Sequence, residues 1–371
     1  MRKIYVCKLK PGMILAKSVY GPNGQLWLRA GVTLTSQYIS SLLRSKINFV
    51  YVLDPFLSDA QNEEIVSDQA RLQANKLVKN VLTNIKQGKQ GPIVDNNFLK
   101  VVNRLVEEVL DNKDVMYNLA DILSTDEYTF NHSVNVCILS LLIASNLRYT
   151  RSRLQDIAVG ALLHDLGKTK IDKRILMKEG CLTNEEFAII KMHPVLGADI
   201  LSCRQRDLAD DSLKIVLQHH ERCDGSGYPH QLLHHQINES ARLVMIVDVY
   251  DALTSDRPYR AALQPHQVLS LLKYSGNHAY DPVFLQTFFE HVPAYPVGTA
   301  LRLSNGDIGL VVKNKVGKTF SPTVRVYWAE GKEPYKNEFE IDLAVEQSIF
   351  VEEVLSEEKK EELFPLYPKN E

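Results

Sequence analysis

The 371-residue sequence lacks several features that would place it in a familiar class. Its five cysteines are odd in number and never spaced Cys-x-x-Cys, so neither a disulfide framework nor a zinc knuckle is expected. No apolar run approaches the ~20 residues needed to span a bilayer, and the N-terminal residues lack the apolar core of a signal peptide. These absences predict a cytoplasmic protein with reduced thiols and no membrane span.

The sequence also lacks an excess of charge of one sign. Its 43 Lys and Arg residues balance 45 Asp and Glu residues, for a net charge of −2, which argues against DNA or RNA as a partner. No Gly-x-Ser-x-Gly elbow occurs. Gly167-Lys168-Thr169 is not a P-loop, because Leu162 stands where that motif requires its first glycine. Neither a serine-nucleophile hydrolase nor a P-loop NTPase is expected.

The chain is long for one hydrophobic core, and its patterns predict several segments. Short β-like runs and one helical stretch at 35–46 open the chain, helical periodicity dominates the middle, and apolar runs alternate with glycine turns near the end. The predicted segments are a small α+β module (1–57), a helical connector (58–114), an all-helical domain (115–293), a small β-barrel-like module or meander of about five strands (294–353) and a charged, mostly frayed tail (354–371).

An amphipathic stripe runs along the connector, where Val101, Val102, Leu105, Val109 and Leu110 repeat at steps of three and four residues. Such stripes are typical of a core or of a seam between helices. The alternative is a homodimer interface through this helical region.

Histidines and aspartates gather in the helical segment. Asp165 follows an apolar stretch, where an unpaired charge would be costly to bury. Neutral imidazoles and carboxylates are ligands for divalent transition metals, and a metal would compensate that charge. The cluster therefore indicates a metal-dependent hydrolase. Its members are His132, His164, Asp165, His193, His219, His220 and Asp248.

Five ordered motifs between residues 119 and 292 resemble the HD-GYP family, a branch of the HD phosphohydrolases. They are Tyr128-Thr-Phe-Asn-His132, His164-Asp165-Leu-Gly-Lys168, His193-Pro-Val-Leu-Gly197, the 219–229 segment ending in Gly227-Tyr228-Pro229, and the stretch from Asp248 to Arg260. The resemblance implies a mainly α protein whose HD-type helical bundle hydrolyses the bacterial second messenger cyclic di-GMP.

The resemblance also implies roles for the residues. The histidines and aspartates named above would hold two divalent ions, with Asp165 bridging them; a ligand set without thiolate favours iron or manganese and leaves other divalent metals open. Asp251 would orient a histidine, and Lys168 would act with Asp165 in catalysis. Two ions are expected because Tyr128 stands where three-metal members carry glutamate. The expected substrate-binding residues are Gly227, Tyr228, Pro229, Arg257 and Arg260.

The expected reaction is attack of a two-metal-activated water on one phosphoester of cyclic di-GMP, which gives linear pGpG; a further step to GMP stays open. Two alternatives remain. One is a cyclic di-GMP receptor whose terminal modules pass a signal to a partner, and the other is an HD phosphohydrolase for another nucleotide. The intact ligand set and Lys168 argue against the first, and the Gly227-Tyr228-Pro229 loop argues against the second.

Overall fold

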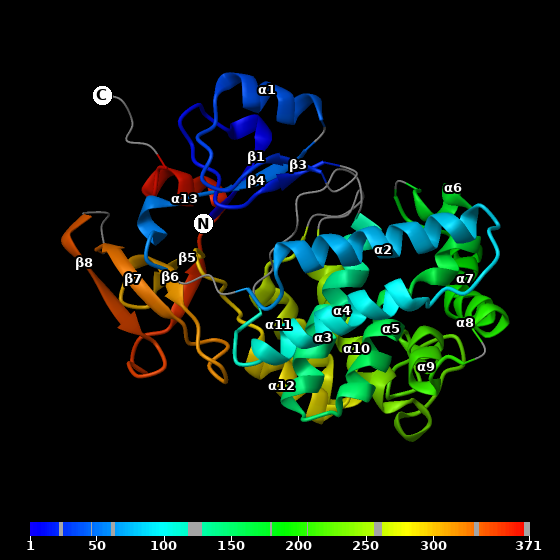
Figure 1. Ribbon diagram of the computed structural model, residues 1–371. Coiled ribbons are helices and arrows are strands. Elements are labelled where there is room, and N and C mark those ends of the chain that lie inside the picture. The colour runs from blue at the N-terminus through cyan, green and yellow to red at the C-terminus, as the bar shows by residue number, and fades with distance from the viewer. Residues whose placement is uncertain are drawn as a thin grey trace. The chain divides into compact units, whose positions relative to one another are not determined.

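The computed structural model describes residues 1–21, 25–45, 47–60, 64–117, 128–178, 180–205, 207–255, 262–329 and 334–366, with the backbone alone at 128–129 and 275–277. These residues fall into two compact units. A helical unit is drawn from residues 64–117 and 128–291, and a mixed unit from residues 1–63 and 292–371 (Figure 1). No helix in the described ranges is both long and apolar enough to cross a membrane.

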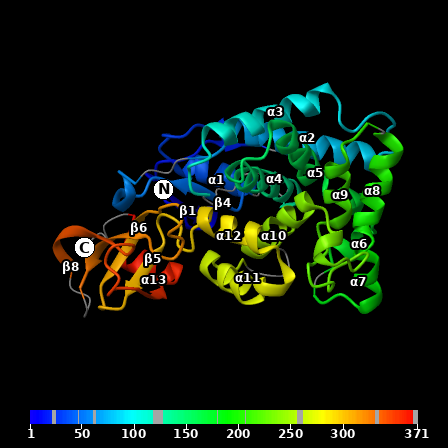
Figure 2. The same cartoon turned by 90° about the horizontal axis from the view of Figure 1, so that it is seen from below.

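The helical unit contains helices of 4 to 19 residues. Its α-helices are α2 (Asp68–Lys86), α3 (Asn96–Asp111), α4 (Tyr128–Asn146), α5 (Arg151–Leu163), α6 (Lys173–Leu176), α7 (Asn184–Ile190), α8 (His193–Arg204), α9 (Asp210–Gln218), α10 (Glu239–Thr254), α11 (Pro265–Ala279) and α12 (Pro282–His291). Two short 3-10 helices, η3 (Leu166–Lys170) and η4 (His234–Gln236), interrupt the series. Figures 1 and 2 agree that α6, α7 and α8 lie together at one end of this unit.

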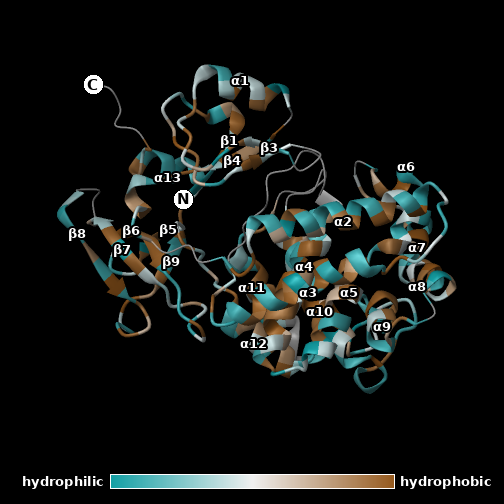
Figure 3. Ribbon diagram, in the orientation of Figure 1, coloured by the Kyte–Doolittle hydropathy of each residue, from teal (hydrophilic) through white to brown (hydrophobic). Residues whose placement is uncertain are grey.

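Helix α4 forms the centre of the helical unit. Residues 132–145 are buried on every side of the helix, and α4 packs against α2, α3, α5, α10 and α12. A helix without a polar face can exist only in such a core. In contrast, α2 and α3 show both polar and apolar residues in Figure 3. The seam predicted on α3 is confirmed, because Val102, Leu105 and Val109 are buried inside the unit.

Local sequence signals set several helix ends as predicted. Thr183 caps α7, and its hydroxyl accepts from the Glu186 amide while Glu186 accepts from the Thr183 amide in return. Thr35 caps the helix expected at 35–46, which forms as α1 (Ser36–Arg44). His193 opens α8 directly before Pro194, a favourable place for proline.

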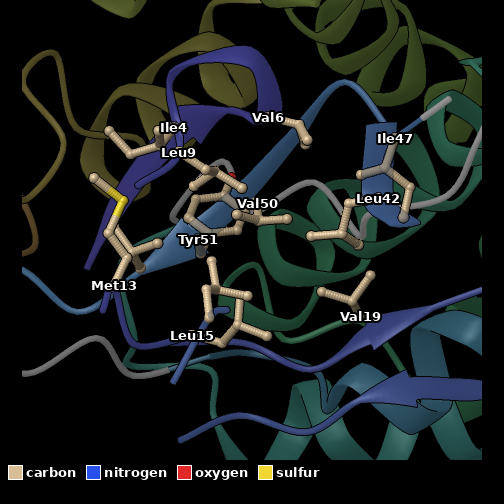
Figure 4. Packing of buried hydrophobic residues seen from close by; sticks show 12 residues of the cluster. Ile4, Val6, Leu9, Met13, Leu15, Val19, Leu42, Ile47, Val50 and Tyr51 are labelled. Atoms are coloured by element: carbon tan, nitrogen blue, oxygen red, sulfur yellow. The ribbon is translucent and has the colours of Figure 1, made fainter. Parts of the chain in front are cut away.

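The mixed unit begins with a small α+β module, as expected. Its strands β1 (Arg2–Tyr5) and β4 (Phe49–Val52) pair antiparallel, with Arg2 opposite Val52, and β2 (Val19–Tyr20) pairs with β3 (Leu26–Leu28). A short 3-10 helix, η1 (Val6–Lys8), lies between β1 and β2, and a second, η2 (Pro55–Leu57), follows β4. Figure 4 shows its core, where side chains from both sheets converge on Leu15 and Val50, which are fully buried.

The C-terminal module is an open five-stranded antiparallel sheet in the order β8-β7-β6-β5-β9. The strands are β5 (Ala300–Leu303), β6 (Ile308–Lys313), β7 (Thr323–Trp328), β8 (Pro334–Asp342) and β9 (Val351–Val354). The expected strand number is confirmed, but the barrel-like form is wrong: in the described residues β8 and β9 remain the two edges and do not pair. A barrel would close only if these two edge strands paired with each other. The alternation of apolar and turn residues predicts strands but not which strands pair over long range.

The expected frayed tail is wrong for residues 354–366, and residues 367–371 lie outside the described residues. The described part forms helix α13 (Glu357–Leu363), capped by Ser356, and Phe364 behind it is fully buried. The Phe364 ring packs edge-to-face against Phe56 and Tyr327, with all three ring centroids 5.4 Å apart. The buried guanidinium of Arg2 donates to the Phe364 carbonyl at 2.7 Å. The N- and C-terminal modules therefore share one unit.

Candidate metal centre

The predicted ligands come from separate elements of the helical unit that meet at one place. His132 lies on α4, His164 and Asp165 follow α5, His193 opens α8, His219 and His220 follow α9, and Asp248 lies on α10. Helix α5 packs against α4 and α9, while α10 packs against the same two helices. Helices α5 and α9 both end at this point, so the residues that follow them lie near His132 of α4 and Asp248 of α10.

The ligand atoms form two groups that share Asp165. Nitrogens and oxygens of Asp165, His193, His219 and His220 lie within 4.8 Å of one another, and so do those of His132, His164 and Asp165. Asp248 lies beside both groups: its Oδ1 is 3.0 Å from His132 Nε2 and 3.8 Å from His164 Nε2, and its Oδ2 is 3.5 Å from His220 Nδ1.

Backbone carbonyls fix the tautomers of three of these histidines. Nδ1 of His164 donates to the Ala161 carbonyl at 2.7 Å, Nδ1 of His193 to that of Ile190 at 2.8 Å, and Nδ1 of His219 to that of Val216 at 2.9 Å. Each Nε2 is thereby left with a lone pair directed into the centre.

These lone pairs show that the residues fit a metal ion. The Nε2 atoms of His193 and His219 face each other at 3.1 Å although both are acceptors. His164 Nε2 and Asp165 Oδ1 are buried with no hydrogen-bond partner. Unsatisfied buried acceptors are costly unless a cation or a donor lies between them. The arrangement of these buried acceptors therefore fits bound cations.

The protonation states agree with this reading. Burial lowers the pKa of His193 to about 4 and that of His220 to about 3, so both rings are neutral near pH 7. Although burial favours the neutral carboxyl, Lys168 and His164 hold the pKa of Asp165 well below its usual range. Burial likewise opposes charge on His132, but Asp248 and Asp251 raise its pKa to about 9. His132 is therefore protonated, and a proton lies between its Nε2 and Oδ1 of Asp248. A bound cation would neutralise the Asp248 carboxylate in place of this proton.

Lys168 and Asp251 flank the centre. Lys168 lies on η3, and its Nζ donates to Asp165 Oδ2 at 2.7 Å while remaining partly exposed. Asp251 Oδ2 accepts from His132 Nδ1 at 2.7 Å, which turns the other ring nitrogen toward Asp165 and Asp248. A carboxylate behind a ligating histidine fixes its orientation and raises its basicity.

Two motif glycines permit close backbone contacts around the centre. A Cβ built on Gly167 would lie 1.9 Å from the His193 carbonyl oxygen, so only glycine lets η3 approach the start of α8. A Cβ on Gly227 would lie 2.3 Å from the Arg222 amide nitrogen. Both glycines thus bring neighbouring segments against the ligands.

The Gly227-Tyr228-Pro229 loop covers one side of the centre. The ring of Tyr228 lies 4.7 Å from the His220 ring, centroid to centroid, and the Tyr228 amide donates to the His220 carbonyl at 3.1 Å. Burial raises the pKa of Tyr228 above its usual range, so its hydroxyl stays protonated and can donate. Arg257 and Arg260 lie outside the described residues, as does the side chain of Tyr128.

Sequence reasoning missed Glu221, which directly follows the two histidines. Its side chain is fully buried and accepts from the His230 amide at 2.7 Å and the Leu232 amide at 3.0 Å. Glu221 therefore clamps the far end of the Tyr228 loop. An acidic residue between a ligand pair and a glycine-rich loop was the only available signal. The chain's second adjacent histidine pair, His234-His235, is not part of these ligand groups, and His234 contacts Asp281 at 3.0 Å instead.

The chain is similar to known proteins over most of its length. A family model described as an HD domain matches residues 114–284, and a model described as a KOW domain associated with HD domains matches residues 300–363. A cyclic di-GMP phosphodiesterase of Pseudomonas aeruginosa is 30% identical over 358 residues, covering 89% of this chain and 86% of that protein.

Two further similar proteins either match a smaller part of this chain or have a lower sequence identity. A 3′3′-cGAMP-specific phosphodiesterase of Vibrio cholerae is 32% identical over 192 residues, which is 51% of this chain and 37% of that protein. The solved structure of an HDG"Y"P protein from Bdellovibrio bacteriovorus has 19% sequence identity and a TM-score of 0.48, covering 77% of this chain and 97% of that one.

Proposed function

Because the chain belongs to the HD-GYP branch of the HD domain family and is a phosphodiesterase, we propose that its substrate is cyclic di-GMP and its product linear pGpG. The observation that carries this proposal is the pair of buried ligand groups that share Asp165. Metal pairs bridged by a carboxylate suit in-line displacement at phosphorus. The P. aeruginosa relative, named for this substrate, supports the choice of cyclic dinucleotide.

The centre would hold two divalent ions. His132, His164 and Asp165 would bind one ion, while His193, His219 and His220 would bind the other together with the second oxygen of Asp165; Asp248 reaches toward both. Iron or manganese suits this donor set of imidazoles and carboxylates. A third ion is not expected, because Tyr128 stands at the position where three-metal members carry glutamate.

The residues around the ions would have distinct tasks. When bound, the ions would supply positive charge that polarises the phosphate and lowers the pKa of an attacking water. Asp165 and Asp248 remain ionised and hold the ligand geometry. Lys168, partly exposed beside Asp165, would neutralise charge on the phosphate. The protonated Tyr228 hydroxyl would donate to the substrate, and Arg257 and Arg260 remain proposed substrate contacts from their place in the sequence.

Two other functions compete with this one. A related cyclic dinucleotide is favoured by the similarity to the V. cholerae enzyme specific for 3′3′-cGAMP. A receptor that only binds cyclic di-GMP is disfavoured, because a receptor has no need for neutral, inward-facing imidazoles beside an ionised aspartate.

The test is turnover by the purified full chain. The protein, prepared without oxygen and supplied with Fe²⁺ or Mn²⁺, is incubated with cyclic di-GMP and separately with 3′3′-cGAMP, and the products are separated by chromatography. The proposal expects pGpG from cyclic di-GMP and slower cleavage of 3′3′-cGAMP. Faster cleavage of 3′3′-cGAMP would favour the second function, and binding of cyclic di-GMP without cleavage under both metals would establish a receptor.

A further inference from the structure

A pocket of about 270 Å³ opens beside His219 and His220. It lies below the roughly 300–1,000 Å³ typical of sites for drug-sized ligands, so it can receive only part of a dinucleotide. Aromatic rings and two cations line it together with small loop residues and Glu221, whose carboxylate is bound by the His230 and Leu232 amides. The described lining residues that matter are Phe187, Lys191, Arg222, Tyr228 and Tyr280.

Both cations rest on aromatic rings. The Lys191 ammonium lies 4.6 Å from the centre of the Phe187 ring and 5.7 Å from that of Tyr228. The Arg222 guanidinium carbon lies 5.9 Å from the centre of the Tyr280 ring. An aromatic face orients a cation through its quadrupole without taking up its N–H donors.

Neither cation forms an ion pair. Among the described residues, no carboxylate lies within ion-pair distance of Lys191 or Arg222, although Arg222 acts electrostatically at longer range on the carboxylate of the neighbouring Asp224. Neighbouring cations of the same unit differ: Lys168 pairs with Asp165, and Arg242 pairs with Asp281. Two oriented cations without an ion pair at the edge of a pocket form a site for an anion.

Backbone hydrogen bonds fix the segments that carry Lys191 and Arg222. Lys191 caps the end of α7, where its amide donates to the Phe187 carbonyl at 2.9 Å. Arg222 precedes Cys223, whose amide donates to the Ala279 carbonyl at 3.0 Å next to Tyr280. The two cations therefore reach the pocket from different segments. Each segment is hydrogen-bonded to the backbone at or next to the aromatic residue that its cation contacts.

We propose that Lys191 and Arg222 bind the second phosphate of a cyclic dinucleotide, the one that is not being cleaved. This inference rests on the proposed function and extends it, since it names the group that selects a substrate with two phosphodiesters. His219 and His220 belong to the metal centre and also line the pocket. A phosphate bound at the centre would therefore lie next to the pocket, and the rest of the ring would enter the pocket and bring the opposite phosphate to both cations.

The experiment compares two charge-removing variants with a matched control in the metal-loaded full chain. Lys191→Gln and Arg222→Gln remove one cation each, whereas Lys173→Gln removes the same charge from an exposed position on α6 that does not line the pocket. Initial rates are measured on cyclic di-GMP and on bis-p-nitrophenyl phosphate, a diester with a single phosphate. Lys191→Arg and Arg222→Lys keep the charge and report on folding.

Each Gln variant should raise the KM for cyclic di-GMP about 10- to 150-fold, the loss expected for one charge-assisted hydrogen bond. The loss in kcat/KM should be at least ten times larger on cyclic di-GMP than on the generic diester. The charge-keeping variants should recover most of the affinity, and Lys173→Gln should match the wild type.

Unchanged KM in both Gln variants would overturn the inference, and so would equal losses on the two substrates, which indicate support of the fold or of the metal centre. The proposed function fails separately, if the metal-loaded wild type leaves cyclic di-GMP intact. In that case calorimetric dissociation constants for cyclic di-GMP decide the inference: weaker binding by both Gln variants supports it, and unchanged binding overturns it.

Discussion

Replacing Gly167 by alanine should disturb the metal centre without touching a ligand. The added Cβ would lie 1.9 Å from the His193 carbonyl oxygen and 2.6 Å from the Gly197 amide nitrogen. Ordinary contact begins at 3.4 Å, so 3.4 − 1.9 = 1.5 Å of separation is needed. Both obstacles are backbone atoms, which cannot rotate away. The start of α8 must therefore retreat from η3 and carry the His193 ring with it.

The expected cost follows from that displacement. Overpacking of this kind lowers the free energy of unfolding by about 1–3 kcal/mol, and misplacing a reacting group by about 1 Å can cost roughly 100-fold in rate. Urea unfolding, metal content and turnover of cyclic di-GMP measure the three effects. Gly167→Ala should stay folded, bind less metal and lose activity about 100-fold.

Gly197→Ala is the matched comparison, because it adds the same methyl group from the opposite side of the same contact. Its nearest obstacle is a Val216 methyl group at 2.9 Å, with backbone no closer than 3.2 Å. A smaller loss is therefore expected. Wild-type activity and metal content in Gly167→Ala would refute the claim that the approach of η3 to α8 positions His193.

Three further predictions concern the centre itself. Asp165→Ala should abolish turnover and lower the bound metal to less than half of the wild-type content, because one carboxylate serves both ligand groups; retention of full metal content would contradict a bridging role. Lys168→Ala should keep its metal and lose about 100-fold in rate, whereas loss of metal would show that the lysine supports the site instead of acting on the phosphate. Asp251→Asn should lower metal affinity or activity about 10- to 100-fold, because a neutral amide supports His132 less well than the carboxylate 2.7 Å away; an unchanged variant would remove Asp251 from the site.

The ligands could be found in the sequence because their chemistry is local and unusual. A His-Asp pair or a His-His pair is weak evidence alone, but their combination in one helical stretch is informative, and the two pairs follow the ends of α5 and α9. The division of the ligands into two groups around Asp165 could not be derived from spacing, because it depends on how α4, α8 and α10 cross.

Other features needed contacts between distant segments. In the sequence, nothing distinguishes Lys191 from a solvated surface lysine. Only the structure shows that its ammonium group contacts the rings of Phe187 and Tyr228. The charged residues of α13 resemble a disordered tail, and only the burial of Phe364 against Phe56 and Tyr327 shows why they fold. The strand count of the C-terminal module follows from its turns, but its open form depends on two edges that do not meet.

In the proposed function, two ions at the Asp165 centre support cleavage of cyclic di-GMP. The most direct measurement is an anaerobic titration of metal-free protein with Mn²⁺ or Fe²⁺, in which bound metal and pGpG formation are followed in the same samples. Activity should be absent without metal and should reach its plateau at two equivalents per chain. Full activity without metal, a plateau at one or three equivalents, or saturation of both sites without any cleavage would contradict this expectation.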